Sequence, residues 1–460
     1  MSSRPNIIVI LADDMGYGDI GAFGNAAVHT PALDRLARQG IALRQHYSAS
    51  PVCAPARAGL LTGRYPHRTG AIDTLEMRGL DRLALREITL ADALRAAGYA
   101  TGLAGKWHLG ALDARYHPNR RGFDEFAGFR GGWQDYWKWT LDCNGATRPA
   151  DGRYLTDVFT DQAVQFIRRH RGRPFFLHLA YNAPHFPLQA PQEDLAPFAG
   201  RFTPAVSLIY AMNRRMDAGI GRVLETLEEL GLAQNTIVLF ASDNGPDMGG
   251  QGDNCAARYN ANLAGSKLYV LEGGIRVPAI VRWPAGLPGG REVHDVVHFN
   301  DWLPTLLSAA GAGLPAHRQL DGVDALPVLR GDKRHIDPVR FWQWNRYTPL
   351  VSCNAAMRDG RWKLVRPALR EAMWITDADA EMDKRAKYEP HAVGGLCREP
   401  EPARNVPDPP PPMLFDLEAD PCERNDLAGQ HPQRVAGMLR ELERWFESVE
   451  RDRRSIDDAW

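Results

Sequence analysis

Two pairs of oxygen-bearing side chains follow buried strand patterns and are suited to holding a metal ion. Asp13 and Asp14 come directly after the early apolar run IIVILA, and Asp243 and Asn244 follow the run TIVLFAS. Adjacent carboxylates repel each other, so a cation lowers the cost of placing both at one strand end. A solvated loop explains an isolated Asp-Asp pair equally well. Hard oxygen ligands from two parallel strands, however, suit Ca²⁺ or Mg²⁺ better than zinc.

A cysteine with an unusual downstream pattern is the candidate nucleophile. Cys53 opens the string CAPAR, which contains Pro55 and Arg57. The proline and the helical pattern after it predict that Cys53 lies at a helix N-terminus. The helix dipole there favours anions and lowers the pKa of a thiol, which would make Cys53 reactive. The alternative is a small buried hydrophobic residue, the more frequent situation of a lone cysteine.

The string CAPAR and the following AGLLTGRYPHRTG resemble the signature of the type I sulfatases, the formylglycine-dependent and arylsulfatase-like members of the alkaline-phosphatase superfamily. The resemblance extends over most of the chain. It implies that a formylglycine-generating enzyme oxidises Cys53 to formylglycine, whose hydrated aldehyde is the nucleophile. Arg57 would hold this hydrate and help to neutralise the metal site. The expected ion is Ca²⁺, with Mg²⁺ or Mn²⁺ as alternatives, and its implied ligands are Asp13, Asp14, Cys53, Asp243 and Asn244.

Four further residues match other motifs of this family. GKWHLG contains Lys106 and His108, PHFP contains His185, and GSK contains Lys267 ahead of EGGIRVP. By resemblance, Lys106 and Lys267 would bind the sulfate oxygens, and His185 with Lys267 would protonate the leaving group. Asp243 and His108 would remove the protons of the two hydroxyls of the hydrate. Taken alone, the lysines would be interpreted as surface charges and the histidines as packed side chains.

Two other functions fit parts of this pattern. Phosphonate and phosphate ester hydrolases of the superfamily also use the C-x-P-x-R cysteine, but they tend to carry uncharged residues at the positions of Lys106 and His108 and a histidine at that of Asn244. A catalytically silent anion- or glycan-binding relative is disfavoured because the complete set of site residues is present. We therefore expect a sulfuric ester hydrolase.

Aromatic residues are the main sequence clue to the substrate. The segment FRGGWQDYWKWT contains Trp137 and Trp139, which we expect to be partly exposed and able to stack on an aryl or sugar ring. Trp342 and Trp344 add to this aromatic content. The substrate is therefore expected to be either an aryl sulfate or a sulfated carbohydrate.

The elements that must position these residues follow an α/β pattern. Residues 5 to 110 alternate short β-branched runs with helical patterns, which is typical of a mostly parallel sheet between helices. Ligand sites in such sheets lie at the carboxyl ends of the strands. We expect residues 1–335 to form this catalytic unit. The predicted elements include strands at Ile7–Leu11, Phe175–Ala180 and Thr236–Ala241 and helices at Pro31–Gln39, Leu90–Ala97 and Val206–Leu230.

Residues 336–460 are expected to form a smaller unit of different character. Short strand-like runs, with a hairpin turn at Asp359-Gly360, predict a small antiparallel sheet. The apolar spacing from Gln433 to Glu450 predicts a terminal helix that packs against this sheet. The proline-rich and charged stretch of residues 371–412 is interpreted as an extended excursion that covers the cleft or mediates an oligomer contact.

Composition narrows the classes of protein that fit. The 460 residues carry a net charge of −1, which argues against nucleic-acid binding and favours a small-molecule substrate. The apolar runs are too short for a membrane span or a signal sequence, so we expect a cytoplasmic protein without membrane contact. The six cysteines are scattered, which argues against a disulfide framework. The sequence leaves open whether the chain forms a homo-oligomer.

Overall fold

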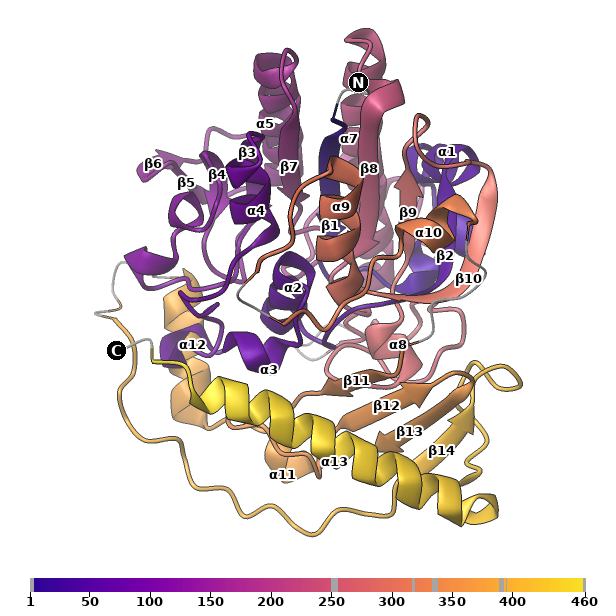
Figure 1. Ribbon diagram of the computed structural model, residues 1–460. Coiled ribbons are helices and arrows are strands. Elements are labelled where there is room, and N and C mark those ends of the chain that lie inside the picture. The colour runs from indigo at the N-terminus through magenta and orange to yellow at the C-terminus, as the bar shows by residue number, and fades with distance from the viewer. Residues whose placement is uncertain are drawn as a thin grey trace.

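A computed structural model describes residues 4–249, 255–316, 319–332, 338–388, 393 and 395–457, and most of them surround a ten-stranded sheet (Figure 1). The strands are β1 (Asn6–Ala12), β2 (Ile41–Tyr47), β3 (Ala100–Lys106), β4 (Glu125–Phe129), β5 (Thr140–Cys143), β6 (Ala146–Pro149), β7 (Phe175–Ala180), β8 (Thr236–Ser242), β9 (Ala279–Arg282) and β10 (Arg291–His298). Their order in the sheet is β10-β2-β9-β8-β1-β7-β3-β4-β5-β6.

The centre of this sheet is parallel, as the sequence predicts. Strands β8, β1, β7, β3 and β4 pair in parallel, whereas β9 runs antiparallel to both β2 and β8. Strands β5 and β6 continue the sheet beyond β4 as an antiparallel hairpin. The large, mostly parallel sheet between helices is therefore confirmed, and the antiparallel strands make it a mixed sheet.

Helices cover both faces of the sheet. Successive side chains of a strand point to opposite faces, and every residue of the central strands is buried, so both faces must be covered. Ile8 and Ile10 of β1 belong to one core cluster, and Ile7 and Val9 belong to the other. The first cluster includes α1 (Pro31–Gln39), α5 (Leu155–His170) and α7 (Pro204–Glu229). The second includes α2 (Cys53–Thr62), α4 (Leu90–Ala96), α9 (Trp302–Ala310) and α10 (Leu326–Arg330). Shorter helices are α3 (Pro66–Thr69), α6 (Gln192–Leu195) and α8 (Glu272–Ile275).

Two of the predicted helices begin by different means. The hydroxyl of Thr89 accepts a hydrogen bond from the Asp92 N–H and forms a capping box at the start of α4. Thr30 stands at the N-cap of α1 but makes no such bond. The carboxylate of Asp217 on α7 instead accepts bonds from the Ala32 and Leu33 N–H groups at 2.9 and 2.8 Å. A residue from a distant helix thus caps α1.

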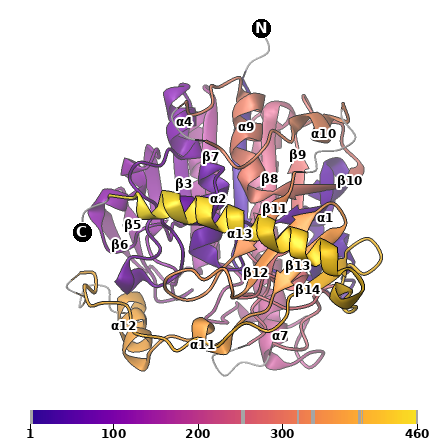
Figure 2. The ribbon, with the colours of Figure 1, turned by 60° about the horizontal axis from the view of Figure 1, so that its bottom comes forward.

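A separate four-stranded antiparallel sheet contains β11 (Arg340–Gln343), β12 (Ala355–Asp359), β13 (Trp362–Arg366) and β14 (Met413–Asp416). The predicted turn at Asp359-Gly360 joins β12 to β13, and Gly360 adopts a φ of 55° there. The terminal helix α13 (Pro432–Arg454) packs its apolar side on this sheet (Figure 2). The expected small sheet with a helix is confirmed, and the expected boundary near residue 335 lies outside the described residues.

The stretch expected to be an extended excursion is partly helical. It contains α11 (Arg370–Met373) and α12 (Asp377–Tyr388), and residues 399–412 then run without regular structure to β14. Helix α12 contacts the 3-10 helix η3 (Glu76–Arg78) of the larger part of the molecule. Within the described ranges, no helix has the length and apolar character needed to cross a bilayer.

Candidate active site

The register of two central strands brings the predicted acidic residues together. Ala12 of β1 lies opposite Ser242 of β8, so Asp13 and Asp243 leave the sheet side by side. The Asp14 N–H donates to Asp243 Oδ1 at 3.1 Å, and Asp14 adopts a φ of 63°. All three carboxylates are buried at the carboxyl ends of the strands, as the fold class predicts.

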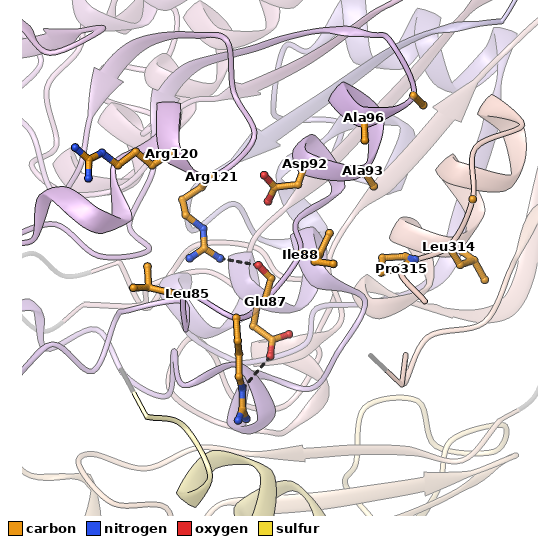
Figure 3. A pocket seen from close by; sticks show the side chains of 13 residues that line it. Leu85, Glu87, Ile88, Asp92, Ala93, Ala96, Arg120, Arg121, Leu314 and Pro315 are labelled. Carbon is orange, nitrogen blue, oxygen red and sulfur yellow. Dashed lines mark hydrogen bonds and ion pairs between the residues drawn. The ribbon is translucent and has the colours of Figure 1, made fainter. Parts of the chain in front are cut away.

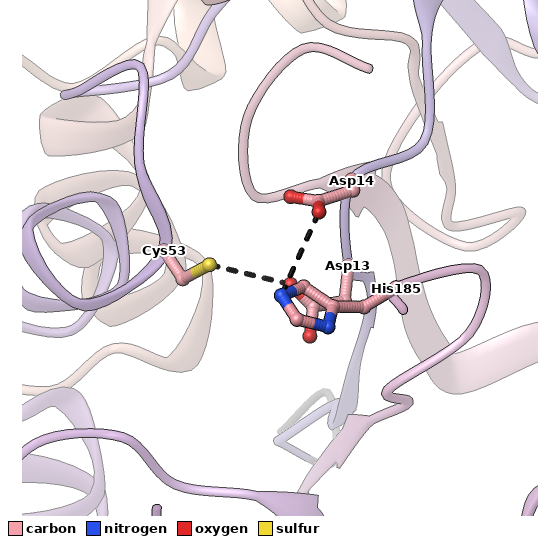
Figure 4. Close-up of side chains that lie close together, drawn as sticks. All are labelled: Asp13, Asp14, Cys53 and His185. Atoms are coloured by element: carbon pink, nitrogen blue, oxygen red, sulfur yellow. Dashed lines mark hydrogen bonds and ion pairs between the residues drawn. The ribbon is translucent and has the colours of Figure 1, made fainter. Parts of the chain in front are cut away.

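The candidate nucleophile lies within this group (Figure 4). One ligand atom from each of Asp13, Asp14, Cys53 and His185 lies within 4.8 Å of the others. The Cys53 thiol donates to Asp13 Oδ1 at 3.5 Å, and His185 Nε2 lies 3.7 Å from Asp14 Oδ2. His185, which the resemblance assigns to the leaving group, therefore also stands next to the expected metal ligands.

Three cations pair with the three carboxylates. Lys106 Nζ lies 2.6 Å from Asp13 Oδ2, and Lys267 Nζ lies 2.6 Å from Asp14 Oδ2. Arg57 donates from Nε and Nη2 to Asp243 Oδ2 at 3.0 and 2.7 Å, and its Nη2 lies 3.7 Å from Asp13 Oδ1. These pairs balance formally, so a divalent ion would give the site the net positive charge that an anionic ester requires.

Cys53 begins α2 as predicted, but the prediction that its thiol has a lowered pKa is wrong. Burial raises the pKa of the Cys53 thiol to about 12; the Lys106 and Lys267 charges lower it, while Asp13 and Asp243 oppose them. The thiol is only 2% exposed, so loss of solvation outweighs the helix dipole. Cys53 at neutral pH is therefore a protonated thiol rather than a thiolate nucleophile.

The donor set fits a hard divalent cation. Asn244 Nδ2 donates to Asp14 Oδ1 at 2.7 Å and to the Gly245 carbonyl oxygen at 2.8 Å. Among the residues that the structure describes, the buried amide oxygen Oδ1 of Asn244 has no hydrogen-bond partner. A buried polar atom without a partner is costly, and amide and carboxylate oxygens are the ligands that Ca²⁺ and Mg²⁺ prefer.

A carboxylate that no motif predicts stands beside His108. Glu76 Oε1 lies 3.6 Å from His108 Nε2, and both side chains are buried. Glu76 lies in the segment TLEMR, which carries no recognisable pattern, and only the three-dimensional fold brings it to the site.

A second unpredicted pair supports the backbone of Asp14. Arg258 Nη2 donates to the Asp14 carbonyl oxygen at 2.9 Å, and Arg258 Nε donates to both oxygens of Asp19 at 3.1 and 3.0 Å. Asp19 also accepts the Gly16 N–H at 2.6 Å. This buried ion pair fixes the turn that carries the paired carboxylates.

Of the two tryptophans predicted to be partly exposed, one agrees with the prediction and one does not. Trp137 is 39% exposed, as expected, but Trp139 is only 1% exposed because it packs in the core next to the sheet. Trp342 and Trp344 are also buried. Trp137 lines a cavity of about 390 Å³ together with Tyr154, Arg153 and Arg215.

A larger hollow of about 670 Å³ lies elsewhere, beside α4 (Figure 3). Its lining includes Ile88, Ala93, Ala96 and Leu314, with Arg120 at its rim. None of the predicted site residues lines it. The hollow is therefore separate from the acidic cluster.

Comparison with known proteins identifies the family. The sulfatase family model matches residues 5–312, and the model described as N-sulphoglucosamine sulphohydrolase, C-terminal, matches residues 266–387. Steryl-sulfatase of Mus musculus is 34% identical over 525 residues, which cover 95% of this chain and 80% of that protein. Arylsulfatase A of Homo sapiens is 32% identical over 487 residues, with 99% and 89% covered.

A solved structure agrees with these relatives. The crystal structure of Ps i-CgsB in complex with k-i-k-neocarrahexaose has a TM-score of 0.80 and 30% identity, and the match covers 96% of this chain and 93% of that one. The chain therefore belongs to the sulfatase family, as a type I sulfatase of the alkaline-phosphatase superfamily that hydrolyses sulfate esters.

Proposed function

We propose that the chain hydrolyses sulfate monoesters through formylglycine made from Cys53 and a bound divalent cation. The observation that carries this proposal is the cluster of Asp13, Asp14, Cys53 and His185 within 4.8 Å, next to the buried Arg57 and Lys106 and the partly buried Lys267. A thiol whose pKa burial raises to about 12 is a poor nucleophile at neutral pH. Oxidation of Cys53 by a maturation enzyme removes this difficulty, because the hydrated aldehyde supplies a hydroxyl instead.

The metal site would use side chains from both central strands. A bound Ca²⁺ or Mg²⁺ would polarise the sulfate ester and the hydroxyl of residue 53 as a Lewis acid. The residues that would hold it are Asp13, Asp14, Asp243, Asn244 and modified residue 53. The unpartnered Asn244 Oδ1 supports this assignment.

Asp243 and Arg57 would prepare the hydroxyl of residue 53. Burial and the neighbouring Asp13 raise the pKa of Asp243 to about 6, while Arg57 opposes them. A bound cation would lower this pKa again, and the ionised Asp243 carboxylate would then accept the proton of the hydroxyl as a general base. Arg57, which donates to this carboxylate with a permanently charged fork, would orient both groups.

Lys106 and Lys267 would bind the sulfate oxygens, and Lys267 with His185 would protonate the leaving oxygen. Burial lowers the pKa of His185 to about 3, and the Lys267 charge lowers it further than Asp14 raises it. His185 Nδ1 lies 2.7 Å from the Phe186 carbonyl oxygen and donates to it, so Nε2 donates only in the imidazolium form. An anionic substrate beside the ring favours that form. His108 would serve as the base for the second hydroxyl.

The sulfatase relatives support a sulfate ester as the reacting group of the substrate but do not define the ring that carries it. Trp137 and its cavity offer an aromatic surface for an aryl or sugar ring. Aryl sulfates and sulfated carbohydrates are therefore both proposed. Phosphate esters, which present a similar tetrahedral anion, are expected as weaker substrates.

The test compares cysteine variants made together with a formylglycine-generating enzyme. Wild-type protein, Cys53→Ala and Cys353→Ala are assayed with calcium on an aryl sulfate, a sulfated sugar and the matched aryl phosphate. Cys353 is a suitable control because it is also buried but lies in a separate core cluster with Leu369 and Ala372. We expect sulfate release from the wild type and from Cys353→Ala, and none from Cys53→Ala. Turnover in Cys53→Ala, or preference for the phosphate ester, would overturn the proposal.

A further inference from the structure

Helix α12 lies beside the loop that packs on His108, although it belongs to the stretch between the third and fourth strands of the smaller sheet. Arg78 Nε of η3 donates to Asp379 Oδ2 of α12 at 2.8 Å. At the other end of the helix, the ring of Tyr388 lies 4.0 Å from that of Trp133, centroid to centroid. These two contacts fix α12 against the larger part of the molecule.

The imidazole of His108 is tightly enclosed. A Cβ atom at Gly132 would lie 2.4 Å from His108 Cε1, so no residue with a side chain fits at that position. The Gly132 N–H donates to Glu76 Oε1 at 2.5 Å, and the same oxygen lies 3.6 Å from His108 Nε2. The ring is thus held between a glycine on one side and a fixed carboxylate oxygen at one nitrogen.

The other charges around His108 oppose its protonation. Burial holds the pKa of His108 well below its usual range, and the charges that lower it further are Lys106, Arg57, Lys387 and His185. Within the described part of the chain, Glu76 is the one carboxylate within 4.0 Å of a His108 ring nitrogen. A base that must carry a proton in this surrounding needs a counter-charge.

We propose that Glu76 is a positioning residue for His108. Glu76 Oε1 would hold Nε2 as the protonated nitrogen, so that Nδ1 is the proton acceptor. The proton taken up by Nδ1 would stay on the ring, and the Glu76 charge would stabilise the imidazolium, as in other carboxylate-histidine pairs. The inference deepens the proposed function, because it rests on His108 being the base.

Charges of α12 and of the neighbouring loop surround Glu76. Burial raises the pKa of Glu76 to about 8, the charges of Asp81 and Asp383 raise it as well, and the charge of Lys387 opposes them. Lys387 Nζ itself pairs with Asp383 Oδ2 of the same helix at 2.6 Å.

The direct test is the tautomer of His108 in full-length protein labelled with ¹⁵N-histidine. Long-range proton-nitrogen spectra are recorded for the wild type, Glu76→Met and Glu76→Gln, with His108 assigned by its absence in His108→Ala. We expect a protonated Nε2 in the wild type and in Glu76→Gln, which keeps an acceptor oxygen for Gly132. Glu76→Met should shift His108 toward the other tautomer. An unchanged His108 tautomer in Glu76→Met would overturn the positioning role.

Kinetics separate this role from a structural one. Glu76 does not belong to the sulfate-binding set, so Glu76→Gln should lower kcat by about 10- to 100-fold with little change in KM. An equal rise of KM in Glu76→Gln, with kcat unchanged, would contradict the positioning role.

Different results would refute the role of Glu76 and the proposed role of His108 as the base. Unchanged turnover in His108→Ala would refute His108 as the base, and with it the catalytic consequence of Glu76. A normal tautomer in Glu76→Met, with activity lost in His108→Ala, would refute Glu76 alone. The tautomer measurement needs neither conversion of Cys53 nor turnover.

Discussion

At the scale of single residues, the site is a set of buried charges that neutralise one another in pairs. Lys106 pairs with Asp13, Lys267 with Asp14, and Arg57 with Asp243. Because the three carboxylates, Lys106 and Arg57 are buried and Lys267 is nearly so, removing one partner leaves an uncompensated charge. Substitutions of these residues therefore disturb folding as well as chemistry. Asn244 is uncharged and is therefore a cleaner probe of metal binding.

Asn244→Ala is expected to weaken calcium binding by about 10- to 100-fold, the range seen when groups that support a metal site are removed. The physical reason is the loss of the unpartnered Oδ1 and of the hydrogen bond from Nδ2 to Asp14 Oδ1. Titration calorimetry on chelator-treated protein measures the affinity. Asn213→Ala is the matched control, since Asn213 on α7 is also buried and without partners among the described residues. Equal calcium affinity in both variants would contradict the metal assignment.

The proximity of the chemistry-bearing residues could be predicted from the sequence because they lie in local strings at strand ends or helix starts. Cys53 and Arg57 share one helix, and Asp13 and Asp14 are adjacent. Glu76 could not be predicted, because its only relation to His108 is spatial. The raised pKa of Cys53 could not be predicted from the sequence either, because the burial that raises it comes from several elements that pack over α2.

At the scale of elements, helix α13 holds the smaller sheet against the catalytic part of the chain. Trp445 stacks on Phe341 of β11 with ring centroids 5.1 Å apart, and it meets Tyr65, which precedes α3, at the same distance. Lys363 of β13 lies 2.9 Å from Glu272 of α8 and 2.8 Å from Glu423, all buried. The two sheets are therefore joined by both aromatic packing and a buried ion cluster.

Trp445→Ala should destabilise the protein by about 3–5 kcal/mol, the usual cost of removing a large buried aromatic side chain. Trp445 is 8% exposed, so most of this apolar area is lost from the core. Urea unfolding followed by circular dichroism measures the loss. Trp374→Ala, at a tryptophan that is 51% exposed, serves as the control and should change stability little. A loss below 1 kcal/mol for Trp445→Ala would mean that α13 is not a structural part of the fold.

Elements whose position depends on local apolar spacing or turn residues could be predicted from the sequence. The helices α1, α4 and α7 and the hairpin at Asp359-Gly360 agree with apolar spacing and turn residues. Helix α12 was missed because the proline-rich composition around it dominates the pattern, and its position depends on contacts with η3. Trp139 is buried against expectation because the aromatic composition of a short segment does not show which side chain faces the core.

At the scale of the whole molecule, metal binding depends on folding, because the proposed ligands follow strands β1 and β8 and meet only when these strands pair. The ligands come from segments more than two hundred residues apart, since β1 and β8 meet only in the folded sheet. A ligand that binds only the folded state stabilises it by about 2.7 kcal/mol at 100 times its Kd. Chelation should therefore lower the Tm, and calcium should restore it.

Differential scanning calorimetry in chelator and in calcium measures this linkage. The calcium-dependent rise of Tm should be present in the wild type and reduced in Asn244→Ala at the same calcium concentration. Magnesium at equal concentration tests the choice of ion. A Tm that is identical with and without calcium in the wild type would contradict a resident calcium site.

The central claim, that sulfate ester hydrolysis depends on modified residue 53, is tested most directly by one paired measurement. Preparations with different degrees of maturation are digested with trypsin, and the mass of peptide Gln45–Arg57 gives the fraction in which the thiol is replaced by an aldehyde. Sulfate release from an aryl sulfate or a sulfated sugar is then plotted against that fraction. The account predicts a straight line through the origin. Activity in unconverted protein, or none in fully converted, calcium-loaded protein on either ester, would contradict it.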